Sequence, residues 1–151
     1  MGKLLLKAVL HNWDMICAYE GSWLTVTWKI NTDGSYLIDE ESFHIPDASD
    51  RIEDVGKKDH VLTKGRMPSD AFAELCSALE QDPWRDPAIE SDGCDGVAWT
   101  IEQYVDGQVV RSSGELGYIY GQENLERIVS LLPKTVQPHG ANAYVSVRRK
   151  D

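Results

Sequence analysis

The sequence predicts a single α+β domain spanning residues 1–151, in which one antiparallel sheet of about five to seven strands packs two helices on one face. Three observations lead to this fold class. Two stretches alternate apolar and polar residues around an Asp-Gly pair, two later stretches repeat apolar residues at helical spacing, and the 151 residues suit one domain. A hairpin followed by a helix occurs twice, so the sequence indicates two hairpin-plus-helix units.

The first predicted strand covers residues 3–10. Its apolar residues do not fix the structure alone, because Leu5, Val9 and Trp13 would also suit one face of a helix.

The first hairpin follows in the stretch SWLTVTWKINTDGSYLIDE. The apolar residues at 24, 26, 28 and 30 alternate with Thr and Lys, which is typical of a half-buried strand. A three-residue loop over 32–34, with Gly34 in the left-handed conformation, pairs Ile30 with Tyr36 and Trp28 with Ile38. This register keeps apolar partners on one face.

The second hairpin has its turn at Asp106-Gly107, because a tight two-residue turn requires positive φ at both positions. Its inner face is predicted to carry the alternate apolar residues Val97, Trp99, Ile101 and Val105. A regular register then sets Val110 beside Gln103 on the inner face, and Glu102 opposite Arg111 on the outer face.

Two helices are predicted from apolar residues at spacing i, i+3, i+4, i+7. The first begins at Pro68-Ser69, ends before Pro83 and is followed by Trp84, which we expect to pack on the helix end. Its apolar residues are Phe72, Leu75, Cys76 and Leu79. The second ends before Pro133 and has as its apolar residues Leu125, Ile128, Val129 and Leu132.

Two segments are predicted to lie outside this pattern. Residues 39–66 are acidic and without clear periodicity, so we interpret them as an irregular excursion, and long excursions are functional or mobile. Residues 143–147 alternate apolar positions and are expected to add an edge strand through which a homo-oligomer could form.

The charge balance bears on the kind of partner. Twenty-five acidic against fifteen basic residues give a formal net charge of −10. Such a charge repels phosphate backbones and anionic lipid, which disfavours nucleic acid and membranes and is compatible with a basic protein partner. The three cysteines are odd in number and widely spaced, and no signal peptide precedes them, so a reducing cytoplasmic location is expected.

Sites with catalytic or metal chemistry are not indicated by the motifs. Cys94 lies among Asp-Gly pairs, whose carboxylates would raise the pKa of a thiol rather than activate it. Neither Asp92 and Asp95 nor the cysteine and histidine spacings match a calcium loop or a zinc site. Ser112-Ser113 lacks the glycine elbow of hydrolases. No catalytic residue, metal or cofactor is therefore predicted.

The candidate binding residues are those that suit contact with another protein. Tyr118 and Tyr120 alternate in the glycine-rich loop before the second helix, and Trp23 lies on the opposite face of its strand from the apolar set. Acidic residues of the excursion complete the set: Asp39, Glu40, Glu41, Asp47, Asp50, Glu53 and Asp54.

The stretches AYEGSWLTVTW, NTDGSY, CDGVAWTIEQY and SSGELGYIYGQENLERIVSLLP resemble a group of small acidic proteins of unknown role encoded in Gram-positive gut bacteria. In size and charge the chain is also similar to bacterial toxin-immunity proteins, which are small, acidic and α+β. These resemblances imply a fold class and no catalytic residue.

Three functional hypotheses follow. The first is a non-enzymatic interaction protein, such as an immunity-type inhibitor, whose acidic surface meets a basic partner. The second is a small-molecule binder or enzyme with a pocket between sheet and helices. The third is a structural subunit of a homo-oligomer.

Overall fold

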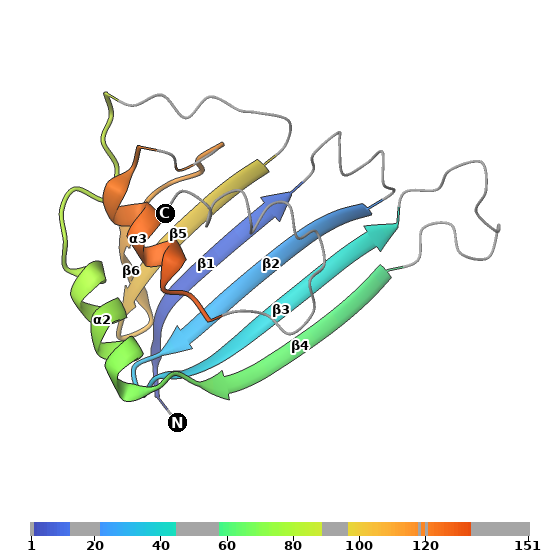
Figure 1. Ribbon diagram of the computed structural model, residues 1–151, viewed down its shortest axis with the longest axis horizontal. Coiled ribbons are helices and arrows are strands. Elements are labelled where there is room, and N and C mark those ends of the chain that lie inside the picture. Colours follow the sequence, from blue (N-terminus) through green and yellow to red (C-terminus); the bar gives the residue numbers. More distant parts are fainter. Residues whose placement is uncertain are drawn as a thin grey trace.

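The computed structural model describes residues 2–12, 22–44, 58–88, 97–117, 119 and 121–133. Within these residues, six strands form one antiparallel sheet in the order β4-β3-β2-β1-β5-β6, and two helices accompany it (Figure 1). The elements are β1 (Leu4–Asn12), β2 (Ser22–Asn31), β3 (Ser35–His44), β4 (Lys58–Arg66), α2 (Ser69–Leu79), β5 (Val97–Val105), β6 (Gln108–Ser112) and α3 (Glu123–Ser130). The predicted α+β fold class is confirmed.

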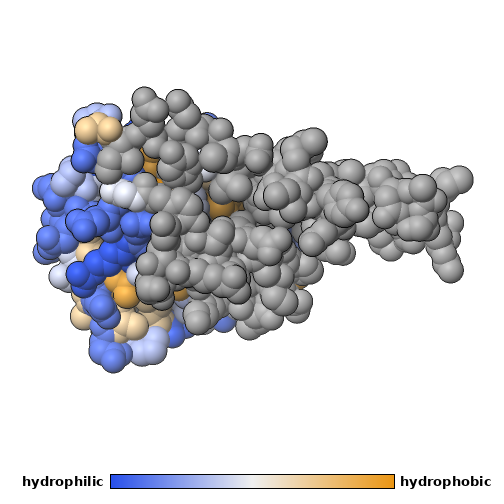
Figure 2. Space-filling view, turned by 45° about the horizontal axis from the view of Figure 1, so that its top comes forward, coloured by the Kyte–Doolittle hydropathy of each residue, from blue (hydrophilic) through white to orange (hydrophobic). Residues whose placement is uncertain are grey.

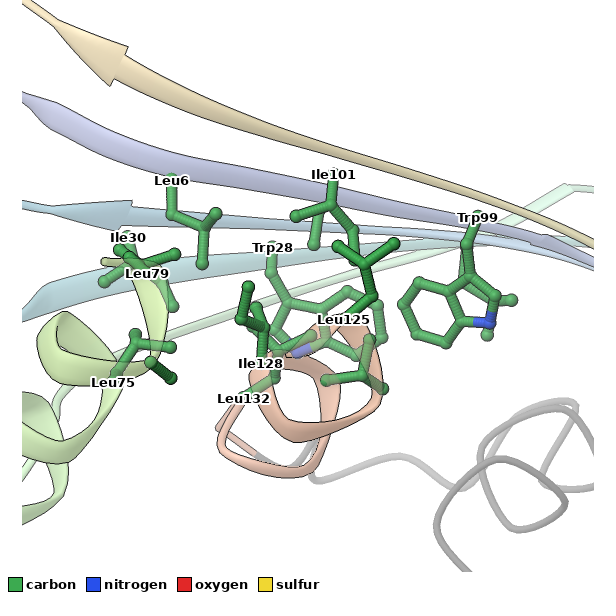
Figure 3. Packing of buried hydrophobic residues seen from close by; sticks show 14 of the residues in the cluster. Leu6, Trp28, Ile30, Leu75, Leu79, Trp99, Ile101, Leu125, Ile128 and Leu132 are labelled. Atoms are coloured by element: carbon green, nitrogen blue, oxygen red, sulfur yellow. The ribbon is translucent and has the colours of Figure 1, made fainter. Parts of the chain in front are cut away.

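The core lies between the helices and one face of the sheet, here called the covered face (Figure 3). The indole rings of Trp28 on β2 and Trp99 on β5 stack there, with centroids 5.7 Å apart and planes 19° apart. Trp28 Nε1 also donates a hydrogen bond to the carbonyl of Pro133 after α3, at 2.8 Å. Burying each large apolar side chain contributes roughly 1.5–3 kcal/mol, so this face dominates the stability of the fold.

Both helices begin and end close to their predicted bounds, and their predicted apolar faces meet the sheet. Leu75 and Leu79 of α2 and Leu125, Ile128 and Val129 of α3 are buried. The period of 3.6 residues therefore identified the packed faces correctly.

Trp84 closes the end of α2, as predicted. It is buried, and its Nε1 donates to the carbonyl of Leu79 at 3.3 Å, which satisfies one of the free carbonyls at the helix end. Gln122, at the start of α3, then holds the following loop, because its Oε1 accepts from Asp86 N at 2.7 Å. The two helices are thus linked through one loop.

The first hairpin has the predicted register. Trp28 pairs with Ile38 and Ile30 with Tyr36, and Gly34 has a φ of +85°. A side chain at Gly34 would be strained at this φ and would also meet the ring of Phe72 on α2. The turn is therefore packed directly against the helical layer.

Asp33, in the same turn, joins three parts of the chain. Its Oδ1 accepts hydrogen bonds from the hydroxyl and the backbone N–H of Ser35, and its Oδ2 accepts from Gly2 N at 3.1 Å. Arg66, at the end of β4, donates to its carbonyl at 2.9 Å. The hydroxyl bond from Ser35, then its backbone bond, lower the pKa of Asp33 from 3.8 to about 2.

We predict that the Asp33 carboxylate makes the free energy of unfolding depend on pH between about pH 4 and pH 2. Because the folded-state pKa is depressed, the stabilisation is complete above pH 3.8 and is lost as the pH falls towards 2. Asp33→Asn should lower the urea midpoint at pH 5, and the difference from the unmodified protein should shrink between pH 4 and 2. A ¹³C titration of the Asp33 carboxyl checks the cause; a midpoint near 3.8 would contradict it.

The second hairpin has the predicted turn but a different register. Asp106 and Gly107 have φ of 51° and 81°, as the two-residue turn requires. Beyond Tyr104, however, Gln103 pairs with Arg111, so Val110 is the extra residue of a β-bulge. The predicted pairing of Glu102 with Arg111 is therefore wrong, and so is the placement of Val105 and Val110 inside, since both side chains are exposed.

The bulge turns Arg111 towards the covered face. Its guanidinium donates to the carbonyls of Leu79 at 2.6 Å and Gln81 at 3.3 Å, pairs with Asp82 and lies over the ring of Trp84. A cation is favourable at a helix C-terminus, where carbonyls are left free. This local gain gives a physical reason for the bulge, which no turn signal in the sequence announces.

The irregular excursion predicted over 39–66 is shorter than expected. Residues 39–44 belong to β3 and 58–66 form β4, which pairs with β3 from Arg66 opposite Ser35 to Lys58 opposite Phe43 without a register shift. Charged residues hid these strands because one face of each is not covered. Residues 45–57 and the predicted edge strand at 143–147 lie outside the described residues.

Candidate functional site

The candidate site is the second face of the sheet, which none of the described helices covers; we call it the open face. Strand alternation and the observed registers give its side chains in three rows across β4, β3, β2 and β1. The first row is Lys64, Leu37, Lys29 and Lys7, the second is Leu62, Asp39, Thr27 and Val9, and the third is His60, Glu41, Thr25 and His11.

The first row brings cations together in a chain of net charge −10. Lys7 lies directly opposite Lys29, and on its other side it lies opposite Glu102 of β5. Lys7, Lys29 and Lys64 make no ion pair with any described residue. Like charges directly opposite each other destabilise a sheet, so the Lys7–Lys29 pair is unfavourable, and Glu102 on the other side of Lys7 offsets it in part.

The third row and its neighbours hold polar pairs. His60 Nε2 lies 2.6 Å from Asp39 Oδ1, and His11 Nδ1 lies 2.9 Å from Thr25 Oγ1. The side chains of His60 and Asp39 are 50% and 38% exposed, so the first pair contributes under about 1 kcal/mol. These contacts orient the side chains more than they stabilise the fold.

An apolar residue lies between these charges. Leu62, on edge strand β4, is 53% exposed, and in the register it faces Asp39 and is diagonal to Leu37. Apolar patches rimmed by polar residues mark protein contact surfaces, and Leu62 contributes to such a patch together with the partly exposed Leu37 and Val9.

Most of the binding residues proposed from the sequence fall outside the described part of the structure. For Trp23, the backbone lies in β2 opposite Phe43, and only its side chain is outside the description. The others outside it are Asp47, Asp50, Glu53, Asp54, Tyr118 and Tyr120.

The three acids at 39–41 do not form one acidic surface, which corrects the prediction for this run. Consecutive strand residues point to opposite faces, so Asp39 and Glu41 lie on the open face while Glu40 is 1% exposed on the covered face, opposite Val26 and Val61. Glu40 is therefore inaccessible to a partner.

A different acidic surface lies over the helical layer, where Figure 2 shows mostly hydrophilic described residues. Its exposed acids are Asp70, Glu74, Glu80, Asp82, Glu115 and Glu123. The open face of the sheet, which carries both lysines and acids, thus differs in charge from the helical layer, where exposed acids predominate.

Ser112 and Ser113 have structural roles, as expected. Ser113 is 2% exposed; its Oγ accepts from Ile101 N at 2.9 Å and donates to the carbonyl of Gly114 at 2.7 Å. Because β6 ends at Ser112, the hydroxyl of Ser113 takes the place of a strand carbonyl as the acceptor for the N–H of Ile101. Ser112 Oγ accepts from Gly114 N at 3.0 Å in an exposed position.

We predict that Ser113→Ala lowers the free energy of unfolding by about 1–3 kcal/mol, because it leaves the buried Ile101 N–H without its acceptor. Ser112→Ala is the matched control and should cost less than about 1 kcal/mol, because Gly114 N can bond to water. Urea denaturation of both variants measures this difference. Equal losses would refute the role given to Ser113.

Among the thiols, Cys76 lies half-buried on α2, as predicted. Burial, and then the nearby Glu80 carboxylate, raise the pKa of this thiol. A raised pKa reduces the thiolate fraction and is opposite to what a nucleophile needs. Cys94, Asp92 and Asp95 lie outside the described residues.

Sequence reasoning missed β4, and with it the basic part of the site. A signal was present: in KDHVLTKGR the even positions are Lys58, His60, Leu62, Lys64 and Arg66, while Val61 and Thr63 alternate with them. The stretch has the period of a strand with a charged outer face, whereas a search for alternating apolar residues overlooks it.

Comparison with protein-family models, curated proteins and solved structures gives no match. Within the described residues, three or more His, Cys, Asp or Glu side chains nowhere gather as metal ligands. No described helix is both long and apolar enough to cross a bilayer. The interpretation of the site rests on its own geometry.

Proposed function

We propose that this chain is a non-enzymatic binding protein that contacts another protein through the open face of its sheet, at the β4 side. The observation that carries the proposal is Leu62, half exposed between the His60–Asp39 pair and Lys64, which forms no ion pair with the residues that the structure describes. An exposed leucine on a strand contributes little to the core, and Lys7 lies opposite a like charge on Lys29; contact with a partner would account for both.

The size of the face indicates the kind of contact that it can make. Strands of nine or ten residues, spaced by about 4.8 Å and rising about 3.3 Å per residue, give four strands a face of roughly 15–20 by 30 Å. The area of roughly 450–600 Å² is below the roughly 800 Å² that each partner buries in a standard interface and is that of a small, transient contact.

An immunity-type inhibitor is one protein of this kind, and there the partner would be a toxin. The expectation of a basic partner points instead to the exposed acids of the helical layer, such as Glu74 on α2. These two surfaces are on opposite sides of the sheet, so an experiment can separate them.

We predict that a photo-crosslinking amino acid placed at Leu62 forms a discrete covalent adduct in the cells that produce the protein, whereas the same residue at Glu74 does not. Both sites are exposed, so neither substitution should disturb folding. Denaturing gels read out the adduct. An adduct from Glu74 alone would move the function to the helical layer and its basic partner, and the open face would be abandoned.

A further inference from the structure

We propose that the edge of β4 binds an extended segment of a partner protein as a seventh strand, and that this segment alternates acidic and apolar residues. The inference rests on the proposed function and specifies the partner: within the described sheet, β4 has a neighbour on one side only (Figure 1).

The first argument is the direction of the backbone groups of β4. Met67 N donates to Gly34 O at 2.9 Å, so Met67 and Gly34 form a hydrogen-bonded pair. Such pairs alternate along an antiparallel ladder, so the odd residues of β4 bond to β3. The N–H and C=O groups of the even residues, including His60, Leu62 and Lys64, therefore point away from β3.

The second argument is the regularity of this edge. Proteins protect sheet edges by making them short, by bulges, or by charged side chains, especially Lys. The opposite edge, β6, follows this rule, with five residues and a bulge at Val110. β4, in contrast, has nine residues and pairs with β3 without a register shift. Its backbone is therefore regular enough for strand addition, while a charged side chain such as Lys64 disfavours strands of like charge and leaves acidic ones.

The third argument is charge, which gives the chemistry of the partner. The even residues that offer backbone groups also carry their side chains on the open face, in the order His60, Leu62, Lys64. An added strand faces these side chains at about 5 Å, where opposite charges stabilise a cross-strand pair. His60 is already engaged with Asp39, at 2.6 Å, so the matching segment has an apolar residue opposite Leu62 and an acid at the alternate position opposite Lys64.

Two acids of β3 do not cancel this preference. Asp39 is paired with His60 on β4, and Glu41 lies one strand further in, so an added strand lies about 10 Å from the backbone of Glu41 and about 5 Å from that of Lys64. The net charge of −10 opposes approach at long range, but salt at about 0.1 M screens it beyond about 10 Å.

The test uses the full chain and labelled ten-residue peptides, measured by fluorescence anisotropy. The probe has glutamate, leucine and glutamate at alternate positions with threonine between them. It should bind about tenfold more tightly than the same peptide with glutamine in place of glutamate, and lysine in those positions should weaken binding further. Equal binding of all three, or tighter binding of the lysine peptide, overturns the proposal.

Two N-methylated probes test the backbone contact. One carries methyl groups on odd amides and the other on even amides, and only one set can point towards β4. One peptide should therefore lose binding, while the other keeps it within about threefold. If both bind or both fail, strand addition is wrong.

Matched protein variants locate the contact. Lys64→Glu should weaken binding of the acidic probe about tenfold, whereas Arg127→Glu, the same charge change at an exposed position on α3, should change it less than about threefold. Equal effects would mean only a general charge response. If sedimentation shows instead a dimer that Lys64→Glu dissociates, a second copy is the occupant and the acidic partner is refuted.

The two proposals fail in different ways. A Leu62 adduct together with failure of the peptides leaves a protein partner on the open face that does not add a strand. Absence of the adduct together with failure of the peptides removes both.

Discussion

The structure depends on burying a six-stranded antiparallel sheet on one face only. The stacked indoles of Trp28 and Trp99, closed by the hydrogen bond from Trp28 to Pro133, hold β2, β5 and the end of α3 together. Because side chains alternate along a strand, every second residue packs into this core and the residues between them face away from it. The core therefore determines which side chains are available for binding, although it takes no part in binding itself.

Sequence patterns predicted those parts of the fold in which local chemistry and burial agree. Gly34 and the Asp106-Gly107 pair need positive φ, and glycine is the residue that adopts it without strain, so both turns were located. The helices were found because apolar periodicity records the packed face. In the first hairpin, the loop length alone set the register of Trp28 against Ile38.

The failures have a common physical origin, since they depend on contacts between distant segments. The bulge at Val110 is stabilised where Arg111 reaches the carbonyls at the end of α2, about thirty residues earlier in the chain. β4 was missed because its even residues are mostly charged. The acids at 39–41 were grouped by their neighbourhood in sequence, whereas the pleat separates Glu40 from Asp39 and Glu41. Net charge likewise describes the whole surface and says little about one strand edge.

The order of the strands has a consequence for synthesis. β1 lies inside the sheet, between β2 and β5, yet it ends at Asn12, and β5 begins at Val97. At a translation rate of about 5–20 residues per second, β5 leaves the ribosome on the order of ten seconds after β1. Throughout this interval the nascent chain can form the β1–β4 meander, but one side of its first strand has no native neighbour. During the same interval Trp28 on β2 lacks its stacking partner Trp99. The incomplete sheet therefore exposes apolar side chains and a free strand edge, both of which favour aggregation, until β5 has been synthesised.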